Sequence, residues 1–260
     1  MSGPGGGPDD TIADLKRRIA ACTLCAGDLP LGPRPIARFS ATARILIIGQ
    51  APGTRVHASG VPWDDDSGDR LRDWLGIDKA TFYDEGLVAQ MPMGFCYPGR
   101  AAGGDAPPRK ECAPQWHDAV LGMLPQDRLT LLVGVHAQAR YLPQLKRLSL
   151  TERVARFGED LPFVALPHPA WRSRLWMTKH PCFETEVLPP LRAMIAAQLA
   201  SAGETPFQRP HGIFTCKANH LWDRTCQRKS RPLSEFWCSR CGAPTCSTSG
   251  WFRAKSPNGP

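Results

Sequence analysis

The chain has 260 residues, enough for one sizeable hydrophobic core with appendages, and its formal net charge is +8. This charge is uneven, because residues 201–260 hold nine Lys and Arg against three Asp and Glu, whereas residues 1–200 hold 23 against 21. Bulk charge therefore does not identify a nucleic-acid-binding protein, and DNA binding has to be argued from a site.

No run of 18 apolar residues occurs, and the Gly- and Pro-rich start has neither the basic nor the apolar part of a signal peptide. We therefore expect a cytoplasmic protein with no membrane partner, working as a monomer. The ten cysteines of such a chain are more typical of thiols or metal ligands than of disulfides.

The first 200 residues alternate helical and strand patterns. Thr11 can cap a first helix, whose apolar residues repeat at helical spacing and which leads to Cys22 and Cys25. Ser67 can cap a second helix that ends near Gly76. Four short apolar runs predict strands, at residues 44–49, 87–91, 129–134 and 163–166.

Two more helices are predicted, one beginning near Pro114 and a closing one over 183–200. The apolar face of the closing helix consists of Leu188, Leu191, Ile195 and Leu199. Strands that alternate with helices form a mostly parallel sheet covered on both faces. Residues 10–200 are therefore predicted to form an α/β domain with three layers, α/β/α, around a central four-stranded sheet. Residues 1–9 form a flexible leader, and 201–260 a basic tail that we expect to be disordered.

Two loops carry the candidate chemistry, because ligands of parallel sheets bind beyond the carboxyl ends of the strands. The first, Gly49-Gln50-Ala51-Pro52-Gly53, can present backbone N–H groups to an anionic or carbonyl oxygen. The second, His168-Pro169-Ala170-Trp171-Arg172, offers a histidine that can donate to a developing negative charge. Taken singly, the first is equally a tight turn without a ligand, and a histidine such as that of the second is more often structural.

Together the two loops resemble the active-site motifs of the uracil-DNA glycosylase superfamily. Gly60-Val61-Pro62-Trp63 resembles the segment that supplies a base-stacking aromatic in its iron-sulfur branch. The resemblance covers most of residues 20–195. It implies a uracil-DNA glycosylase-like fold, DNA with a damaged or deaminated base as partner, and hydrolysis of the N-glycosidic bond in base-excision repair.

Four cysteines support the same branch. Cys22-x2-Cys25, followed by Cys96-x15-Cys112, resembles the pattern by which those glycosylases hold a 4Fe-4S cluster with four thiolates. The alternative is a zinc-like Cys-x2-Cys pair with two unrelated buried thiols. Cys182 has no counterpart and is most simply a packed or free thiol.

The resemblance also implies roles for individual residues. Negative charge on the departing base would be stabilised by two backbone N–H groups and an imidazole, those of Gln50, Ala51 and His168. The flipped base would meet Gly49, Pro52, Gly53 and the stacking ring of Trp63, although Trp63 is equally a core residue. The loop that enters the minor groove would carry Trp171, Arg172 and Arg174, of which Arg174 is equally a surface charge.

The chain departs from the family pattern at positions that matter for catalysis. Relatives place Glu at Gln50 or Asp at Ala51, so the first loop has no carboxylate to orient the attacking water. Pro92 stands where a uracil-reading Asn is expected, and proline has no side-chain hydrogen-bonding group. Residues 64–66, all Asp, supply a substitute acid or form a solvated loop.

These departures leave three functions open. The first is an active DNA glycosylase whose substrate is uracil or another base, with a pocket reshaped by residues 93–95. The second is a catalytically weak or inactive DNA-binding member of the superfamily that retains the fold and the cluster. The third is a structural zinc protein that uses the cysteines alone. The tail cysteines include half of a zinc knuckle at Cys238-x2-Cys241, but the irregular remainder, Cys226 and Cys246, favours no ordered metal site there.

Overall fold

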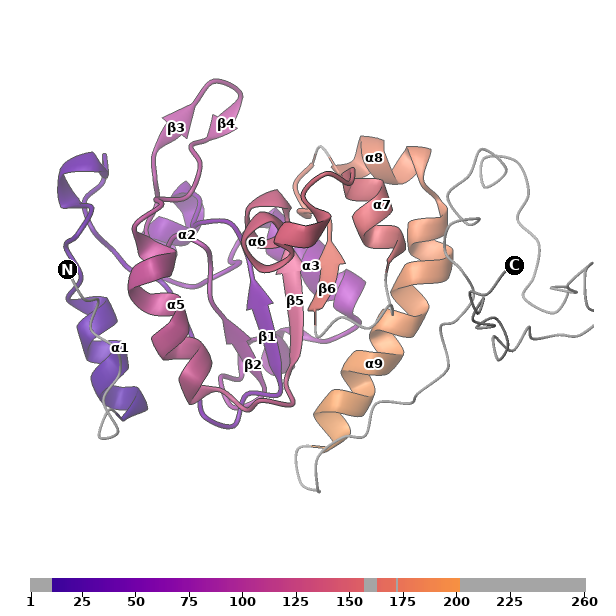
Figure 1. The fold of residues 1–260 in the computed structure, drawn as a ribbon, viewed down its shortest axis with the longest axis horizontal. Helices are drawn as coiled ribbons and strands as arrows, with labels where there is room; N and C mark the ends of the chain where they lie inside the picture. The colour runs from indigo at the N-terminus through magenta and orange to yellow at the C-terminus, as the bar shows by residue number, and fades with distance from the viewer. Residues whose placement is uncertain (1–10, 157–162, 172, 202–260) are drawn as a thin grey trace, which may run out of the picture.

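A computed structural model describes residues 11–156, 163–171 and 173–201 of the chain (Figure 1). The predicted leader and, apart from Ser201, the predicted tail with its cysteines lie outside the described residues, and so does Arg172. None of the helices in the described ranges is long and apolar enough to cross a membrane.

The main sheet has four strands in the order β2-β1-β5-β6, and every neighbouring pair is parallel. The strands are β1 (Ile45–Ile48), β2 (Val88–Gln90), β5 (Leu129–Val133) and β6 (Phe163–Leu166). All four predicted strands are therefore confirmed, and the sheet is parallel throughout. A small antiparallel hairpin, β3 (Arg100–Ala101) and β4 (Gly104–Asp105), was not predicted and extends from the end of the sheet at which the strands finish (Figure 1).

Helices cover both faces of the sheet. On one face lie α1 (Ile12–Ala20), α5 (Cys112–Met123) and α6 (Val135–Tyr141), and on the other α3 (Asp66–Leu75), α4 (Lys79–Tyr83), α7 (Leu150–Ala155) and α9 (Leu188–Ala200). Two short helices, α2 (Thr54–Ser59) and α8 (Ser173–Lys179), follow the two candidate loops.

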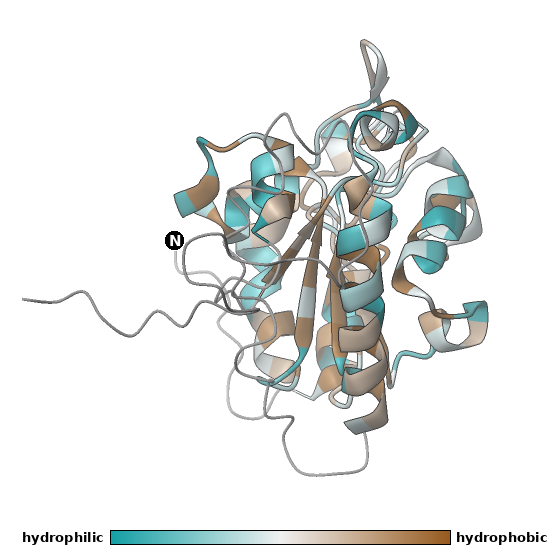
Figure 2. Ribbon diagram, turned by 90° about the vertical axis from the view of Figure 1, so that its right-hand side faces the viewer, coloured by the Kyte–Doolittle hydropathy of each residue, from teal (hydrophilic) through white to brown (hydrophobic). Residues whose placement is uncertain are grey.

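Alternation along β1 divides the core between the two faces. Leu46 and Ile48 belong to the cluster under α1 and α5, whereas Ile45 and Ile47 belong to the cluster under α3 and α9. All four side chains are fully buried, as expected of a parallel strand covered on both faces. Figure 2 shows the apolar strands enclosed between helices of mixed hydropathy. The three-layer α/β/α prediction is confirmed.

Helix caps explain where several helices begin and end. The Thr11 hydroxyl accepts from the Asp14 N–H at 3.2 Å, as predicted for α1. The prediction that Ser67 caps α3 is wrong. The cap is Asp65, whose carboxylate accepts from the Gly68 N–H at 2.9 Å, and the helix begins at Asp66. Gly76 ends α3 in the left-handed conformation, with φ 67°, which glycine adopts without a steric penalty.

The predicted closing helix is two segments. A π-helical turn spans Phe183–Val187, and α9 follows directly. Pro189 and Pro190 lack the N–H groups that would bond back into the preceding turn, which accounts for the change of helix type at this point. The face that α9 buries contains Leu188, Leu191 and Ile195 as expected, whereas Leu199 is only partly buried.

Candidate active site

The first candidate loop leaves β1 at Gly49. Its carbonyl groups are used, because the Met93 N–H donates to the Gly49 oxygen and the Gly94 N–H to the Gln50 oxygen, each at 3.0 Å. The N–H groups of Gln50 and Ala51 donate to no acceptor among the described residues. The two groups that the sequence marked as donors are therefore available to a ligand.

The second candidate loop leaves β6 and is tied down by side chains from two helices. Arg70 of α3 donates to the Pro169 oxygen at 2.6 Å, and the Ser173 hydroxyl at the start of α8 donates to the His168 oxygen. His168 also packs against the end of β5, because a Cβ on Gly134 would lie 3.4 Å from the His168 Cβ. The position of the imidazole is thus fixed by its backbone and by Gly134.

Trp63 lies between the two loops. Its indole covers Gly49 so closely that a Cβ on that glycine would approach the Trp63 Cζ2 atom to 2.6 Å. The centre of the indole is 5.8 Å from that of the His168 ring, at an interplanar angle of 35°. The ring is partly exposed, and it contacts the hydrophobic cluster under α3. The structure therefore brings Gly49, Trp63 and His168 together.

The Trp63 backbone is in an unusual conformation, with φ 58°, and no other non-glycine residue in the described ranges has a positive φ. For a bulky residue this conformation costs roughly 1–2 kcal/mol, and such strain concentrates at ligand sites. Two contacts hold it: the Tyr83 hydroxyl donates to the Trp63 oxygen at 3.1 Å, and Gly68 lies directly beneath the same oxygen.

Replacing Gly68 tests how tightly Trp63 is held. A Cβ at Gly68 would lie 1.8 Å from the Trp63 oxygen, so we expect Gly68→Ala to displace Trp63 and to lower the free energy of unfolding by about 1–3 kcal/mol in urea melts. Gly122→Ala is the matched control, since a Cβ there meets nothing within 4 Å and alanine is favoured in a helix by about 1 kcal/mol. Equal effects of the two substitutions would contradict this packing.

Charges near His168 come from two elements. Burial lowers the pKa of His168, Asp65 opposes this shift, and His136 of α6 adds to it. The imidazole is therefore neutral at pH 7, with one N–H to donate, and it makes no hydrogen bond within the described part of the chain. The aspartates at 64–66 are more than a solvated loop, because Asp65 caps α3 and Asp66 pairs with Arg55 at 2.8 Å.

The segment that contains Pro92 runs beside the first loop. The Pro92 oxygen is held by the His117 Nε2 atom at 3.1 Å, and the His117 Nδ1 atom lies 2.6 Å from the Tyr141 hydroxyl. The His117 ring is fully buried and stacks between Phe95 and Tyr141. Pro92 is thus next to the candidate site, with its carbonyl turned to His117 and no side-chain polar group of its own.

The burial of His117 predicts a pH dependence of stability. Burial lowers the pKa of His117 to about 4, below the ordinary value of about 6.5, so the unfolded chain takes up a proton that the folded chain refuses. The free energy of unfolding should therefore fall by up to about 3 kcal/mol as the pH drops from 6.5 to 4. We expect His117→Gln to remove this part of the slope in urea melts at pH 4–8; an unchanged slope would show that His117 is not its source.

The predicted DNA-contacting loop is exposed. Trp171 keeps 72% of its surface accessible and Leu175, on the next turn, 66%. Arg174 is exposed at the start of α8, whereas Arg172 lies outside the described residues. Sequence reasoning missed Leu175, whose apolar side chain in water is the feature that could have marked it.

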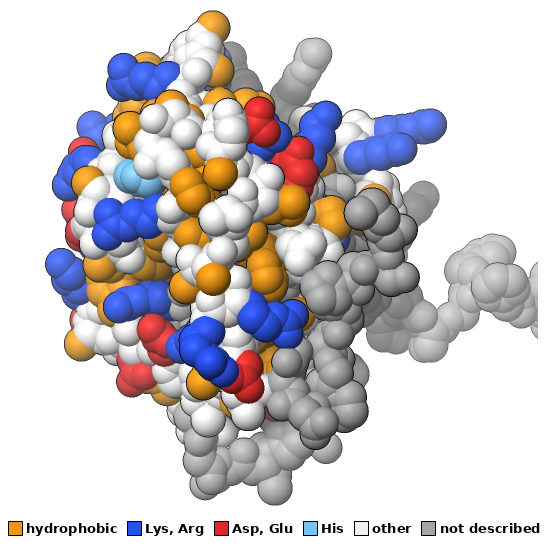
Figure 3. Space-filling view, turned by 90° about the vertical axis from the view of Figure 1, so that its left-hand side faces the viewer, with side chains coloured by type: hydrophobic (Ala, Val, Ile, Leu, Met, Phe, Trp, Pro, Cys, Tyr) orange, Lys and Arg blue, Asp and Glu red, His pale blue; other side chains and the backbone are white. Residues whose placement is uncertain are grey.

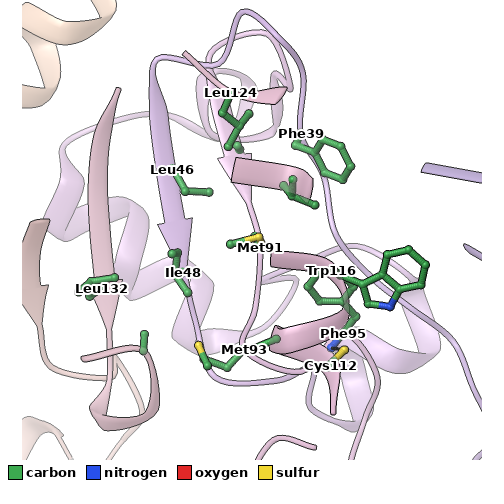
Figure 4. Close-up of a cluster of buried hydrophobic side chains, with 14 of the residues drawn as sticks. Phe39, Leu46, Ile48, Met91, Met93, Phe95, Cys112, Trp116, Leu124 and Leu132 are labelled. Atoms are coloured by element: carbon green, nitrogen blue, oxygen red, sulfur yellow. Dashed lines mark hydrogen bonds between the residues drawn. The ribbon is translucent and has the colours of Figure 1, made fainter. Parts of the chain in front are cut away.

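Cys22, Cys25, Cys96 and Cys112 line a common cavity. They come from the residues after α1, from the segment after β2 and from the first turn of α5. Leu29, Phe95 and Trp116 form its apolar wall, and the Phe95 N–H donates to the Cys112 sulfur at 3.2 Å (Figure 4). The topology therefore gathers the four cysteines that the sequence singled out, whereas Cys182 is buried elsewhere.

These thiols have the chemistry of ligands, although they do not converge on one point. Burial raises the pKa of Cys112 to about 12, and the charges of Cys96, Cys22 and Cys25 add to the rise. Arg109, which also lines the cavity, lowers the pKa of Cys25 against the larger effect of burial. No group of three or more His, Cys, Asp or Glu in the described ranges is placed to hold a single metal ion.

Basic side chains do not form one patch on the face that carries α1. Figure 3 shows Lys and Arg there spread among hydrophobic and acidic side chains. Charge alone thus remains a weak guide to the DNA-binding face, in agreement with the near neutrality of residues 1–200.

The family model of the uracil DNA glycosylase superfamily matches residues 36–192, more than half of the chain. The match includes both candidate loops, Trp63 and two of the four cysteines, Cys96 and Cys112. Cys22 and Cys25 precede it.

Proposed function

The chain belongs to the uracil DNA glycosylase superfamily, and on this premise we propose that it is a DNA glycosylase of the iron-sulfur type that releases uracil or another deaminated or damaged base during base-excision repair. The observation that carries the proposal is the position of the Trp63 indole between Gly49 and His168. A flipped base needs a ring to stack on and donors at its edge, and this arrangement offers both.

The donors act on the bond-breaking step. When the bond between the base and C1′ of the sugar breaks, the electron pair stays with the base, so groups that donate to its carbonyl oxygen lower the barrier. The Gln50 and Ala51 N–H groups are unused by the described residues, and the lowered pKa of His168 keeps its imidazole neutral. A neutral imidazole donates without needing a prior protonation.

The exposed loop supports DNA binding. Trp171 and Leu175 offer apolar side chains that can replace a base extruded from the stack, and Arg174 can meet a phosphate. Arg172, which we also assign to this contact, lies between them in sequence. In this proposal the exposed apolar side chains have a function that they would lack on an ordinary surface.

The substrate range is proposed to extend beyond uracil. The side chain at Pro92 cannot hydrogen-bond to the edge of uracil, and its carbonyl is already engaged by His117. A side chain that hydrogen-bonds to uracil disfavours other bases, because they leave that side chain without a partner. A site without such a side chain does not disfavour them in this way. Hypoxanthine and xanthine therefore join uracil as candidate substrates.

We propose a 4Fe-4S cluster held by Cys22, Cys25, Cys96 and Cys112. The shared cavity, the apolar wall and the nearby Arg109 support it, because four thiolates are the usual ligand set of such clusters. The cluster would supply structural cross-linking between the N-terminal segment and α5, and none of the steps described above uses it.

The second candidate function is a DNA-binding member with weak or no catalysis. The first loop carries Gln50 and Ala51 where relatives carry an acid, and this observation favours it. The cytoplasmic location and the monomeric state stay predictions.

One experiment separates the two candidate functions. Purified protein is incubated with oligonucleotides that carry uracil, hypoxanthine or xanthine, single-stranded or in duplexes, and abasic sites are revealed by alkaline cleavage while binding is followed by fluorescence anisotropy. An active glycosylase cleaves at least one lesion strand, whereas an inactive binder retains lesion DNA without strand cleavage.

A further inference from the structure

Asp105 lies against the first candidate loop, although it is 52 residues away from Gly53 in sequence. A Cβ built on Gly53 would be 3.3 Å from the Asp105 Oδ2 atom, so the carboxylate touches the loop that lacks an acid of its own. The hairpin β3–β4 delivers it, because Asp105 pairs with Arg100 across the two strands.

The hairpin is narrow and well anchored at its base. Gly99, with φ 95°, starts it, and the Ala106 N–H donates to the Gly99 oxygen at 2.8 Å. Gly99 also approaches Pro30, since a Cβ there would lie 3.0 Å from the proline ring. The hairpin therefore holds Asp105 at the end of the sheet where the two candidate loops lie (Figure 1).

The charges that face Asp105 come from three elements. Burial raises the pKa of Asp105, Arg100 of β3 lowers it, Asp65 at the start of α3 raises it, and a hydrogen bond from Tyr97 lowers it. Asp65 also acts on His168. Asp105 and His168 thus have Asp65 as a common charged neighbour, and Asp105 itself contacts the first candidate loop at Gly53.

Two of the three aspartates at 64–66 already have partners. Asp65 caps α3 through Gly68, and Asp66 is paired with Arg55. Asp105 is free of such a capping role, and both of its partners, Arg100 and Tyr97, leave it an acceptor.

We propose that Asp105 orients and deprotonates the water that attacks the sugar, replacing the carboxylate missing from residues 50–51. This inference rests on the proposed function. The bond between C1′ and the base nitrogen breaks, and its electron pair leaves with the base, held by His168 and the loop N–H groups. Water forms the new bond to C1′, its proton passes to the Asp105 carboxylate, and the base anion later takes a proton from solvent.

The test compares Asp105→Asn with Asp118→Asn, an exposed aspartate of α5. Single-turnover release from an oligonucleotide with one uracil, and from one with one hypoxanthine, is measured with enzyme in excess, and DNA affinity by anisotropy. We expect Asp105→Asn to slow release by about 100-fold, with affinity unchanged or slightly tighter, because a negative charge near phosphates is lost. Asp118→Asn should keep the wild-type rate.

A pH profile adds a readout that a structural role would not move. The wild-type rate should fall on the acid side with an apparent pKa above that of an ordinary Asp, and Asp105→Asn should lose this limb, with Asp65 and Arg100 unchanged. If the wild type releases bases and Asp105→Asn does so at the same rate, or if Asp65→Asn alone abolishes the acid limb, the inference is wrong and the proposed function stands. If the wild type releases no base, both fall.

Discussion

His168→Ala is expected to reduce the single-turnover rate of base release by about 100- to 1,000-fold, the usual effect of removing one donor from an anion-stabilising site. The imidazole is the one ionisable side chain in either candidate loop that the structure describes, and its lowered pKa keeps it neutral. Its loss leaves only the N–H groups of the first loop to hold charge on the departing base. The affinity for lesion DNA should change little, because phosphate contacts supply most of it.

His180→Gln is the control for this prediction. His180 lies at the end of α8, where its ring contacts Trp176 rather than the candidate loops. The rate of His180→Gln should stay within about twofold of the wild type, and the melting temperatures of both variants should be close to it. A wild-type rate in His168→Ala would remove the imidazole from the mechanism, whatever the activity of the protein.

Cys112→Ala is expected to abolish the visible absorption of the purified protein and to lower its iron content, when both are measured after anaerobic purification. Cys112 is the most deeply buried of the four cavity cysteines, and its sulfur accepts a hydrogen bond from the Phe95 N–H. Three thiolates bind a four-iron cluster less firmly than four, and thiolate-to-iron absorption disappears with the cluster. Melting should also occur at a lower temperature, since binding of a metal group contributes to folding.

Cys182→Ala separates these effects from the simple loss of a buried thiol. Cys182 is 5% exposed and contributes no side chain to the cavity of the other four. The free energy of unfolding of the Cys182→Ala variant should fall by about 1 kcal/mol through lost packing, while its visible spectrum and iron content stay those of the wild type. A colourless wild-type protein that contains zinc would contradict the cluster and favour the structural zinc site.

Most of the central sheet was predictable because its strands are short, apolar and β-branched. Runs such as Ile45–Ile48 are buried on both faces of the sheet, so every residue in the run is apolar. An apolar run this short is typical of a buried strand rather than of a helix. The gathering of Cys22 and Cys25 with Cys96 and Cys112 was implied by the resemblance alone, since spacing does not reveal which distant segments meet.

Other features depended on competition between local signals or on contacts between distant residues. Three consecutive aspartates precede Ser67, and the carboxylate of Asp65, not the Ser67 hydroxyl, caps α3. The five- to seven-residue helices, such as α4, are too short for a periodic face to be recognised. Asp105 follows the tip of a two-residue turn, and only the folded chain shows that it meets Gly53.

The backbone of Trp63 is the clearest case of a site feature that pattern cannot supply. Its positive φ is held by Tyr83 and Gly68, which lie on two different helices. Local preference disfavours this conformation for tryptophan, so it arises from tertiary contacts.

The most direct test of the proposed glycosylase activity is mass-spectrometric detection of free base. The wild-type protein is incubated with one duplex pool that contains uracil, hypoxanthine and xanthine at separate known positions. At least one of these bases should appear in the supernatant, in amounts equal to the abasic sites formed, and its initial rate of release should be about 100- to 1,000-fold lower with His168→Ala. Intact lesion DNA bound to the wild-type protein, with no free base after prolonged incubation, would contradict the proposed activity.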